Sequence, residues 1–123
     1  MAVGAIAFQA QAQATSAGVP RGAKYVAMGS SFAAGPGITP TKPGSPAACG
    51  RSADNYASKV AARFGLALTD VTCSGATANI LTTGQHGRPP QISAVTADTR
   101  LVTVTIGGSD VNYLGSLTSS AAV

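Results

Sequence analysis

The chain lacks tryptophan and has few aromatic or charged residues, and these shortages limit what kind of protein it can be. Of its 123 residues, 5% are aromatic and 10% are charged, whereas 45% are hydrophobic. A core must therefore be built from Ala, Val, Leu and Ile, as in a globular domain made of small side chains. The length allows one domain and leaves no room for a second core.

The basic residues never form a run of three. Eight Lys and Arg residues against four acidic ones give a net charge of +4, but the basic residues are scattered singly along the chain. A surface that follows nucleic-acid phosphates needs clustered Lys and Arg, usually with stacking aromatic residues. Nucleic acid is therefore not an expected partner. The eight basic residues are Arg21, Lys24, Lys42, Arg51, Lys59, Arg63, Arg88 and Arg100.

The chain has no apolar run of the roughly 18 residues that span a bilayer, so stable membrane insertion is not expected. The first fourteen residues, MAVGAIAFQAQAQA, carry no charge and contain two small-x-small sites of the type that signal peptidase cleaves. We interpret residues 1–14 as a signal-peptide remnant and the protein as secreted. A disordered Ala/Gln tail is the alternative. Residues 15–23 are a polar leader marked by Gly and Pro.

Histidine and cysteine are scarce. The chain has one histidine, two cysteines and no Cys-x-x-Cys spacing, so it offers too few ligands for a metal site, and we expect no cofactor. An even cysteine count in a chain with an export-like start favours a disulfide between Cys49 and Cys73. Two buried free thiols are the alternative.

Hydrophobic patterning predicts strands at residues 24–28, 66–73 and 101–106, the last of them dense in β-branched residues. Residues 75–83 follow the second strand and are compatible with the beginning of a helix. Between the first two strands, residues 33–50 contain four prolines and four glycines, which predicts a surface loop. Residues 84–90, which also contain Gly and Pro, are predicted to interrupt regular secondary structure a second time.

The clearest predicted helix lies in residues 51–65. Tyr56, Val60 and Phe64 recur there at i, i+4 and i+8, and Lys59 falls on another face. Ser52 or Asp54 can cap the start of the helix, and Gly65 can take the left-handed position at its end.

Strand, helix, strand, helix, strand is the order of parallel α/β units with right-handed crossovers. In such sheets, sites form where the strands end at their carboxyl edge. The three predicted strands are followed by Gly29-Ser30-Ser31, Cys73-Ser74-Gly75 and Gly107-Gly108-Ser109-Asp110. All three stretches contain glycine and a hydroxyl side chain, which favours a reaction site at this edge.

The first of these stretches has three interpretations. A phosphate cradle does not fit, because the glycines do not form G-x-G-x-x-G and no Gly-Lys-Ser/Thr follows. A nucleophilic serine fits better, since Gly29-Ser30-Ser31-Phe32-Ala33 is close to the G-x-S-x-G elbow of α/β hydrolases, with Ala in the last position. From this stretch alone, a serine-rich turn without a chemical role is the simplest interpretation.

Three stretches of the sequence, taken together and in their order along the chain, are more informative than the first stretch alone. GSSFAAG resembles the first block of the SGNH (GDSL) hydrolases, CGRSADNYASKVAARFGLALTDVTCSGATANIL resembles their second block and its lead-in, and VTIGGSDVNYLG resembles the third. The resemblance runs from about residue 24 to residue 114 and is strongest to secreted, actinobacterial-type lipases and esterases, in which paired cysteines also flank the first helix. It implies a three-layer α/β/α fold with a parallel, flavodoxin-like sheet. Residues 24–123 would form the amino-terminal part of one such domain, truncated after the third strand.

The resemblance also implies roles for individual residues. Ser31 matches the nucleophile, and Gly75 matches the glycine whose backbone N–H helps to hold the oxyanion. Ser109 stands where the family has the Asn that supplies another oxyanion donor, and Asp110 matches the acid after that Asn. Ser30 replaces the Asp of the first block. The expected activity is hydrolysis of a small-molecule or lipid ester through a serine acyl-enzyme, by a protein that is a monomer in its full-length form.

The general base is missing from this pattern. A serine nucleophile needs a neighbouring imidazole, which the family carries in a late Asp-x-x-His block. This chain has no such block, and His86 lies in the loop before the third strand, where no family block places the base. We therefore expect the 123-residue chain by itself to be inactive. One alternative is a non-catalytic SGNH-like remnant that binds a lipid or glycan, and another is an α/β hydrolase built on the serine elbow.

Overall fold

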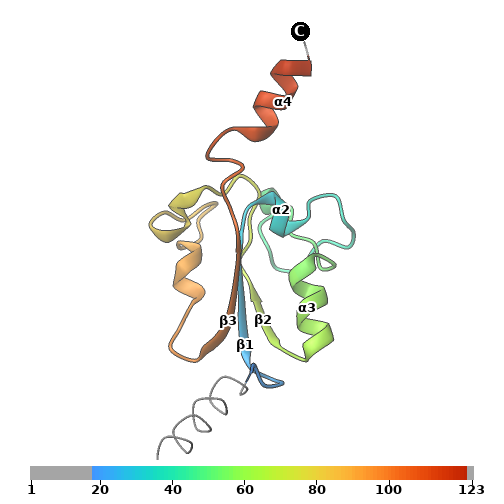
Figure 1. The fold of residues 1–123 in the computed structure, drawn as a ribbon, viewed down its shortest axis with the longest axis vertical. Helices are drawn as coiled ribbons and strands as arrows, with labels where there is room; N and C mark the ends of the chain where they lie inside the picture. Colours follow the sequence, from blue (N-terminus) through green and yellow to red (C-terminus); the bar gives the residue numbers. More distant parts are fainter. Residues whose placement is uncertain (1–17, 122–123) are drawn as a thin grey trace, which may run out of the picture.

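A computed structural model describes residues 18–121, which form a parallel sheet with helices packed on it (Figure 1). The strands are Lys24–Gly29 (β1), Ala67–Asp70 (β2) and Thr99–Thr105 (β3), in the order β2-β1-β3. The α-helices are Ser31–Ala34 (α2), Tyr56–Phe64 (α3) and Tyr113–Ala121 (α4), and the 3-10 turns are Ala47–Cys49 (η1), Ala78–Leu81 (η2) and Gln91–Ala94 (η3). The predicted α/β class with a parallel sheet is confirmed.

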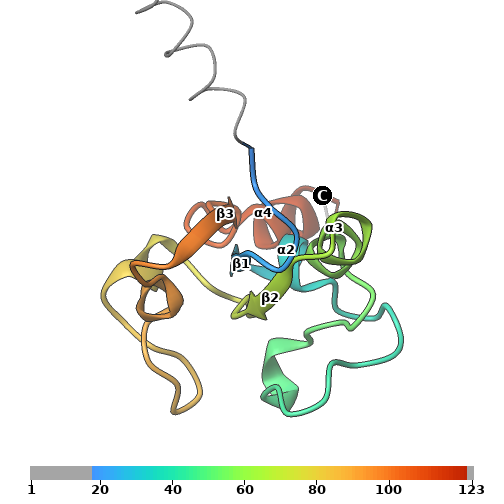
Figure 2. The ribbon, with the colours of Figure 1, turned by 90° about the horizontal axis from the view of Figure 1, so that it is seen from below.

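The central strand β1 separates two hydrophobic clusters, because its successive side chains point to opposite faces of the sheet. Tyr25 and Ala27 pack against Ala57 and Ala61 of α3. On the other face, Val26 and Met28 pack with residues of η2 and η3, including Ile80 and Ile92. Figures 1 and 2 agree that α3 and η3 lie on opposite sides of the sheet. The second covering layer is thus made of short 3-10 turns in this part of the chain.

Helix α3 is shorter than predicted and has a different N-cap. The cap is Asn55, whose side-chain oxygen accepts a hydrogen bond from the Ser58 N–H at 3.0 Å, so the prediction of Ser52 or Asp54 is wrong. Ser52 is instead part of an isolated antiparallel bridge and accepts a bond from the Asp54 N–H. Gly65 ends the helix in the left-handed conformation, as predicted. Phe64 is 53% exposed, because the helix approaches the sheet through its small alanines.

Two other predicted elements also differ. The strand predicted at residues 66–73 is assigned only as Ala67–Asp70, although backbone bonds to β1 continue beyond it. The helix predicted at residues 75–83 is the short 3-10 turn η2, which Thr77 caps by accepting a hydrogen bond from the Asn79 N–H. The third strand agrees with prediction but begins two residues earlier, at Thr99. The loop at 33–50 contains α2's end and η1 but is otherwise irregular.

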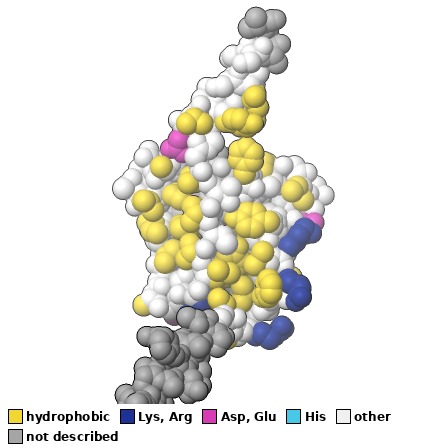
Figure 3. Space-filling model, viewed as in Figure 1, with side chains coloured by type: hydrophobic (Ala, Val, Ile, Leu, Met, Phe, Trp, Pro, Cys, Tyr) yellow, Lys and Arg dark blue, Asp and Glu magenta, His cyan; other side chains and the backbone are white. Residues whose placement is uncertain are grey.

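Apolar side chains remain exposed along β3 and in α4. Val102 and Val104 of the edge strand are 39% and 50% exposed, and Leu114 of α4 is 64% exposed. Hydrophobic side chains gather along the middle of one face of the molecule (Figure 3), and α4 extends away from the sheet (Figure 1).

Within the described residues, no helix combines the length and apolarity needed to cross a bilayer. The predicted signal-peptide remnant at 1–14 lies outside the described residues, and the leader at 15–23 is described only from Gly18.

Candidate active site

The end of β1 is held close to the end of β3, and this approach requires a glycine. Gly29 has φ +147°, and a Cβ added there would lie 2.3 Å from the Thr105 carbonyl oxygen. The Ser30 N–H donates to the same carbonyl at 2.9 Å. Only glycine tolerates both the backbone angle and the contact. The chain then turns directly into α2, of which Ser31 is the first residue.

The two adjacent serines, Ser30 and Ser31, have different environments. Ser30 is 1% exposed, and its hydroxyl oxygen has no hydrogen-bond partner among the described residues. Ser31 is half-buried and lines a cleft. The backbone differs between them: Ser30 is the N-cap of α2 with extended backbone angles, and Ser31 is the first residue of the helix. Of the two, only Ser31 can meet a substrate.

The second glycine-bearing stretch runs alongside the first. The Val71 N–H donates to the Ala27 carbonyl and the Cys73 N–H to the Gly29 carbonyl, so the chain follows β1 beyond β2 to Ser74 and Gly75. The predicted disulfide between Cys49 and Cys73 is present. Gly75 has φ +83°, a conformation that favours glycine.

The third stretch is attached to the second by Asp110. Its carboxylate accepts bonds from the Ala78 N–H at 2.9 and 3.1 Å, at the start of η2. This contact places the loop that carries Ser109 beside the loop that carries Gly75. At the rim, the rings of Phe32 and Tyr113 lie 6.5 Å apart in a tilted arrangement. Asp110 is therefore a positioning residue in this structure.

Ser31, Gly75 and Ser109 line one cleft of about 580 Å³, so the structure brings together all three residues predicted for the site. The N–H groups of Ser31 and Gly75 donate to no protein acceptor within residues 18–121. Pro36, Ala48, Gly50 and Ser74 form part of the wall, so the proline- and glycine-rich loop is one side of the cleft. The arrangement provides a hydroxyl group and two unpaired N–H donors at the same opening.

Buried polar residues that sequence reasoning missed hold this geometry in place. The Gln91 side chain is buried and bonds both polar groups of Gly29, accepting from its N–H at 2.8 Å and donating to its carbonyl at 3.1 Å. Asn55 donates to the Ala34 carbonyl of α2 and to Asp70 at 2.9 Å. A lone Gln after two prolines, or an Asn before a helix, carries no sequence signal that reveals such contacts.

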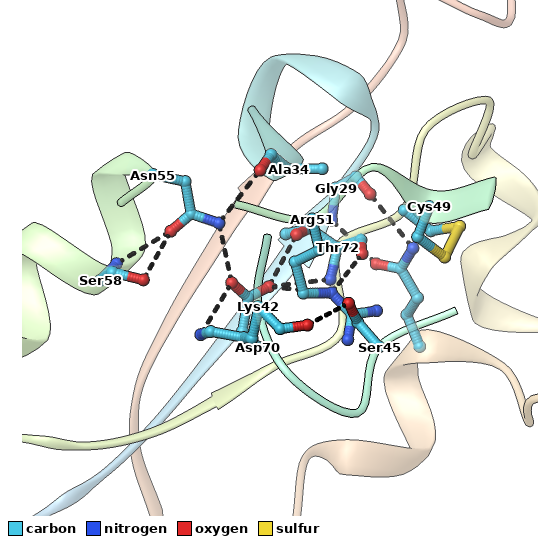
Figure 4. Close-up of polar contacts among 12 residues, drawn as sticks. Gly29, Ala34, Lys42, Ser45, Cys49, Arg51, Asn55, Ser58, Asp70 and Thr72 are labelled. Atoms are coloured by element: carbon cyan, nitrogen blue, oxygen red, sulfur yellow. Dashed lines mark hydrogen bonds and ion pairs between the residues drawn. A yellow bond between two sulfur atoms is a disulfide. The ribbon is translucent and has the colours of Figure 1, made fainter. Parts of the chain in front are cut away.

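Asp70 is the centre of the polar network behind the site (Figure 4). Its side chain is 1% exposed and accepts four hydrogen bonds: from the Thr72 N–H and hydroxyl, from the Asn55 amide, and from the Lys42 ammonium at 3.3 Å. The Nε atom of Arg51 lies 3.7 Å from Oδ1 of Asp70. A buried carboxylate is stable only when it is bonded in this way.

His86 does not line the Ser31 cleft. One of its ring nitrogens lies within 4.8 Å of the sulfur atoms of Cys49 and Cys73. Because both sulfurs are in the disulfide, neither is available as a thiolate ligand, and the group offers a metal ion a single imidazole. The structure therefore places the one histidine of the described residues away from Ser31.

The fold is similar to two solved structures of Streptomyces enzymes. One is the extracellular lipase from Streptomyces rimosus, with a TM-score of 0.66 and 32% identity, covering 78% of this chain and 38% of that one. The other is phospholipase A1 from Streptomyces albidoflavus NA297, with a TM-score of 0.64 and 32% identity, covering 80% of this chain and 39% of that one.

The sequence is similar to a curated relative and matches a family model. Lipase 2 of Streptomyces coelicolor is 45% identical over 87 residues, which cover 70% of this chain. The matched segment spans 29% of the length of that relative. The model of the GDSL-like Lipase/Acylhydrolase family matches residues 27–123, and this range contains all three candidate site residues. The chain belongs to the GDSL-like Lipase/Acylhydrolase family.

Proposed function

We propose that a full-length form of this protein hydrolyses carboxylic esters with Ser31 as the nucleophile. The observation that carries the proposal is one cleft lined by both Ser31 and Gly75, whose backbone N–H groups have no protein acceptor among the described residues. Membership of a lipase and acylhydrolase family supports the same reaction. The matched segment spans less than half the length of each of these three relatives, and the activity is therefore proposed for a full-length form.

In this mechanism, the Ser31 oxygen attacks the ester carbonyl and passes its proton to a general base. The carbonyl oxygen becomes an oxyanion, which the N–H groups of Ser31 and Gly75 stabilise as preorganised donors. Collapse of the tetrahedral intermediate expels the alcohol, which takes up the proton, and leaves an acyl group on Ser31. Water then attacks the acyl-enzyme, releasing the carboxylic acid and restoring the hydroxyl. The base is an imidazole supplied from beyond the described residues, since His86 lies outside the cleft.

The relatives indicate the substrate class and the place of action. Two of them are named lipases, one of these extracellular, and the third is a phospholipase A1. We therefore extend the proposal to lipid or small-molecule esters outside the cell, handled by a monomer. The rim residues Phe32 and Tyr113 are 58% and 48% exposed, which provides an apolar border for an acyl chain.

Ser109 gives a direct test of the oxyanion arrangement. A serine hydroxyl is shorter than the Asn amide that the family carries here, and loss of one oxyanion donor typically costs about 100- to 1000-fold in rate. In the full-length protein, we expect Ser109→Asn to raise kcat by about tenfold or more, as measured with a chromogenic short-chain ester. Ser116→Asn, on the exposed face of α4, is the matched control and should leave kcat unchanged. Equal rates in both variants would count against a role for position 109.

A covalent probe tests the proposed nucleophile. A fluorophosphonate forms a stable adduct only with an activated serine, so we expect full-length protein to be labelled at Ser31, as located by fragmentation of the tryptic peptide that contains residues 25–51. Ser31→Ala should abolish the label, whereas Ser30→Ala should retain it, since the Ser30 hydroxyl is buried. A folded full-length protein that takes up no label would favour the non-catalytic binding domain, with which the serines at positions 30 and 109 are compatible.

A further inference from the structure

A second cavity, of about 370 Å³, lies on the other side of the disulfide from the Ser31 cleft. The side chains of Cys49 and Cys73 line this cavity, whereas their neighbours Ala48 and Ser74 line the cleft. The bridged segments therefore form a common wall between the two. We call this cavity the Arg51–Arg88 pocket. Its lining includes Gly44, Pro46, Arg51, Gln85, Arg88 and Pro90.

The pocket has more positive than negative charge. Arg51 and Arg88 line the pocket, Lys42 lies near it on Asp70, and Asp70 is the one acidic residue in the lining. The two carboxylate oxygens of Asp70 already accept four hydrogen bonds, one of them from Lys42, which fills their capacity. Arg51 is ion-paired with Asp70 at 3.7 Å but donates no hydrogen bond to it, and Arg88 has no carboxylate partner among the described residues.

Arg51 is largely buried, and its terminal N–H donors have no protein partner among the described residues. Its side chain is 12% exposed, and its Nε donates to the Thr72 carbonyl at 2.8 Å. No hydrogen bond to a protein group within residues 18–121 involves its two terminal nitrogens. Burial lowers the pKa of Arg51, with Asp70 opposing this effect and Arg88 adding to it. Asp70 is shared between Arg51 and Lys42, so it does not balance the whole positive charge, and partly buried cations are costly unless anions compensate them.

Arg88 completes the arrangement from the opposite loop. Its one protein hydrogen bond in the described structure runs from Nη2 to the Gly44 carbonyl at 3.2 Å, so most of its planar fork is unengaged. Guanidinium forks bind carboxylate and phosphate oxygens in pairs of charge-assisted bonds. Beside them, Pro46, Pro90 and Val71 provide an apolar wall.

We propose that the Arg51–Arg88 pocket binds an oxyanion group, a carboxylate or a phosphate, carried by a small ligand whose apolar part lies against the proline-lined wall. The site is separate from the Ser31 cleft and does not rest on the proposed ester hydrolysis. The oxyanion accepts hydrogen bonds from the terminal nitrogens of Arg51 and from the fork of Arg88. The ligand arrives by the open side of the pocket, where Arg88 is exposed.

Titration of the ¹⁵N-labelled chain tests the proposal, with hexanoate, acetate and inorganic phosphate as probes at constant chloride. We expect saturable shifts of the Arg51 Nε–H and of the Gln85 and Gln91 side-chain amides. Tighter binding of hexanoate than of acetate and phosphate would identify an organic carboxylate as the preferred ligand. Tightest binding of phosphate would identify a free or esterified phosphate instead, and both results support an oxyanion site.

Arg88→Gln should weaken binding by about tenfold or more, because it removes a charged hydrogen-bond donor. The variant should stay folded, since Arg88 is exposed and makes one protein hydrogen bond among the described residues. Arg63→Gln is the control: it removes the same charge from the surface of α3, outside the pocket, and should leave binding unchanged. Absence of saturable shifts, or equal affinities in Arg88→Gln and the unsubstituted chain, would overturn the proposal.

Discussion

Replacing Ser31 with alanine is expected to lower kcat for ester hydrolysis by about 10⁵- to 10⁶-fold, because it removes the oxygen that forms the acyl-enzyme. The substitution deletes one hydroxyl from the start of α2 and leaves both unpaired N–H groups of the cleft in place. Substrate binding should therefore change little, and KM should stay within a few-fold of its original value. Steady-state kinetics of full-length protein with a soluble p-nitrophenyl ester measure both quantities.

Ser30→Ala is the matched control, since it deletes the same hydroxyl one residue earlier. The Ser30 oxygen is buried and unpartnered in the described structure, so its removal should leave kcat nearly unchanged and should not reduce stability. The two variants separate chemistry from local packing. A Ser31→Ala enzyme that keeps its activity, or a Ser30→Ala enzyme that loses as much, would contradict the assignment of the nucleophile.

Replacing Asp70 with alanine is expected to lower the free energy of unfolding by about 3–5 kcal/mol, the usual range for removal of one partner from a buried ion pair. The substitution leaves the Asn55 amide and the Thr72 hydroxyl without their acceptor and leaves Lys42 and Arg51 without their counter-charge. Asn55 also bonds the Ala34 carbonyl, so the loss should loosen α2, the helix that presents Ser31. Urea unfolding followed by circular dichroism gives the change in free energy.

Asp54→Ala supplies the comparison for an exposed ion pair. Oδ1 of Asp54 lies 2.9 Å from Nζ of Lys59, but the two side chains are 53% and 67% exposed, respectively. Water screens such pairs, which contribute about 0–1 kcal/mol. Asp54→Ala should therefore change stability far less than Asp70→Ala. Equal effects of the two substitutions would show that the buried network is not a major source of stability.

Short-range patterns explain why much of the fold was predictable. The β-branched run in β3 and the glycine at the end of α3 specify local conformations through residues that are neighbours in the chain. The first and last residues of the helices and strands were less predictable, because tertiary contacts compete there with the local sequence preferences. Ser52 failed as a helix cap since its hydroxyl is used in the preceding turn, and the predicted helix at 75–83 is reduced to the 3-10 turn η2.

The amino-acid order specifies the reactive groups: three stretches of glycine and hydroxyl residues, in an order that matches one hydrolase family. Their meeting in one cleft follows from the parallel sheet, which brings the ends of β1 and β3 and the chain beyond β2 to the same edge. Other features depend on the three-dimensional packing: Ser30 is buried, the Gln91 side chain bonds Gly29 across 62 residues of sequence, and two arginines distant in the chain share a pocket. The physical reason is that burial and long-range hydrogen bonds depend on which segments the fold packs together, and no local pattern in the chain encodes those pairings.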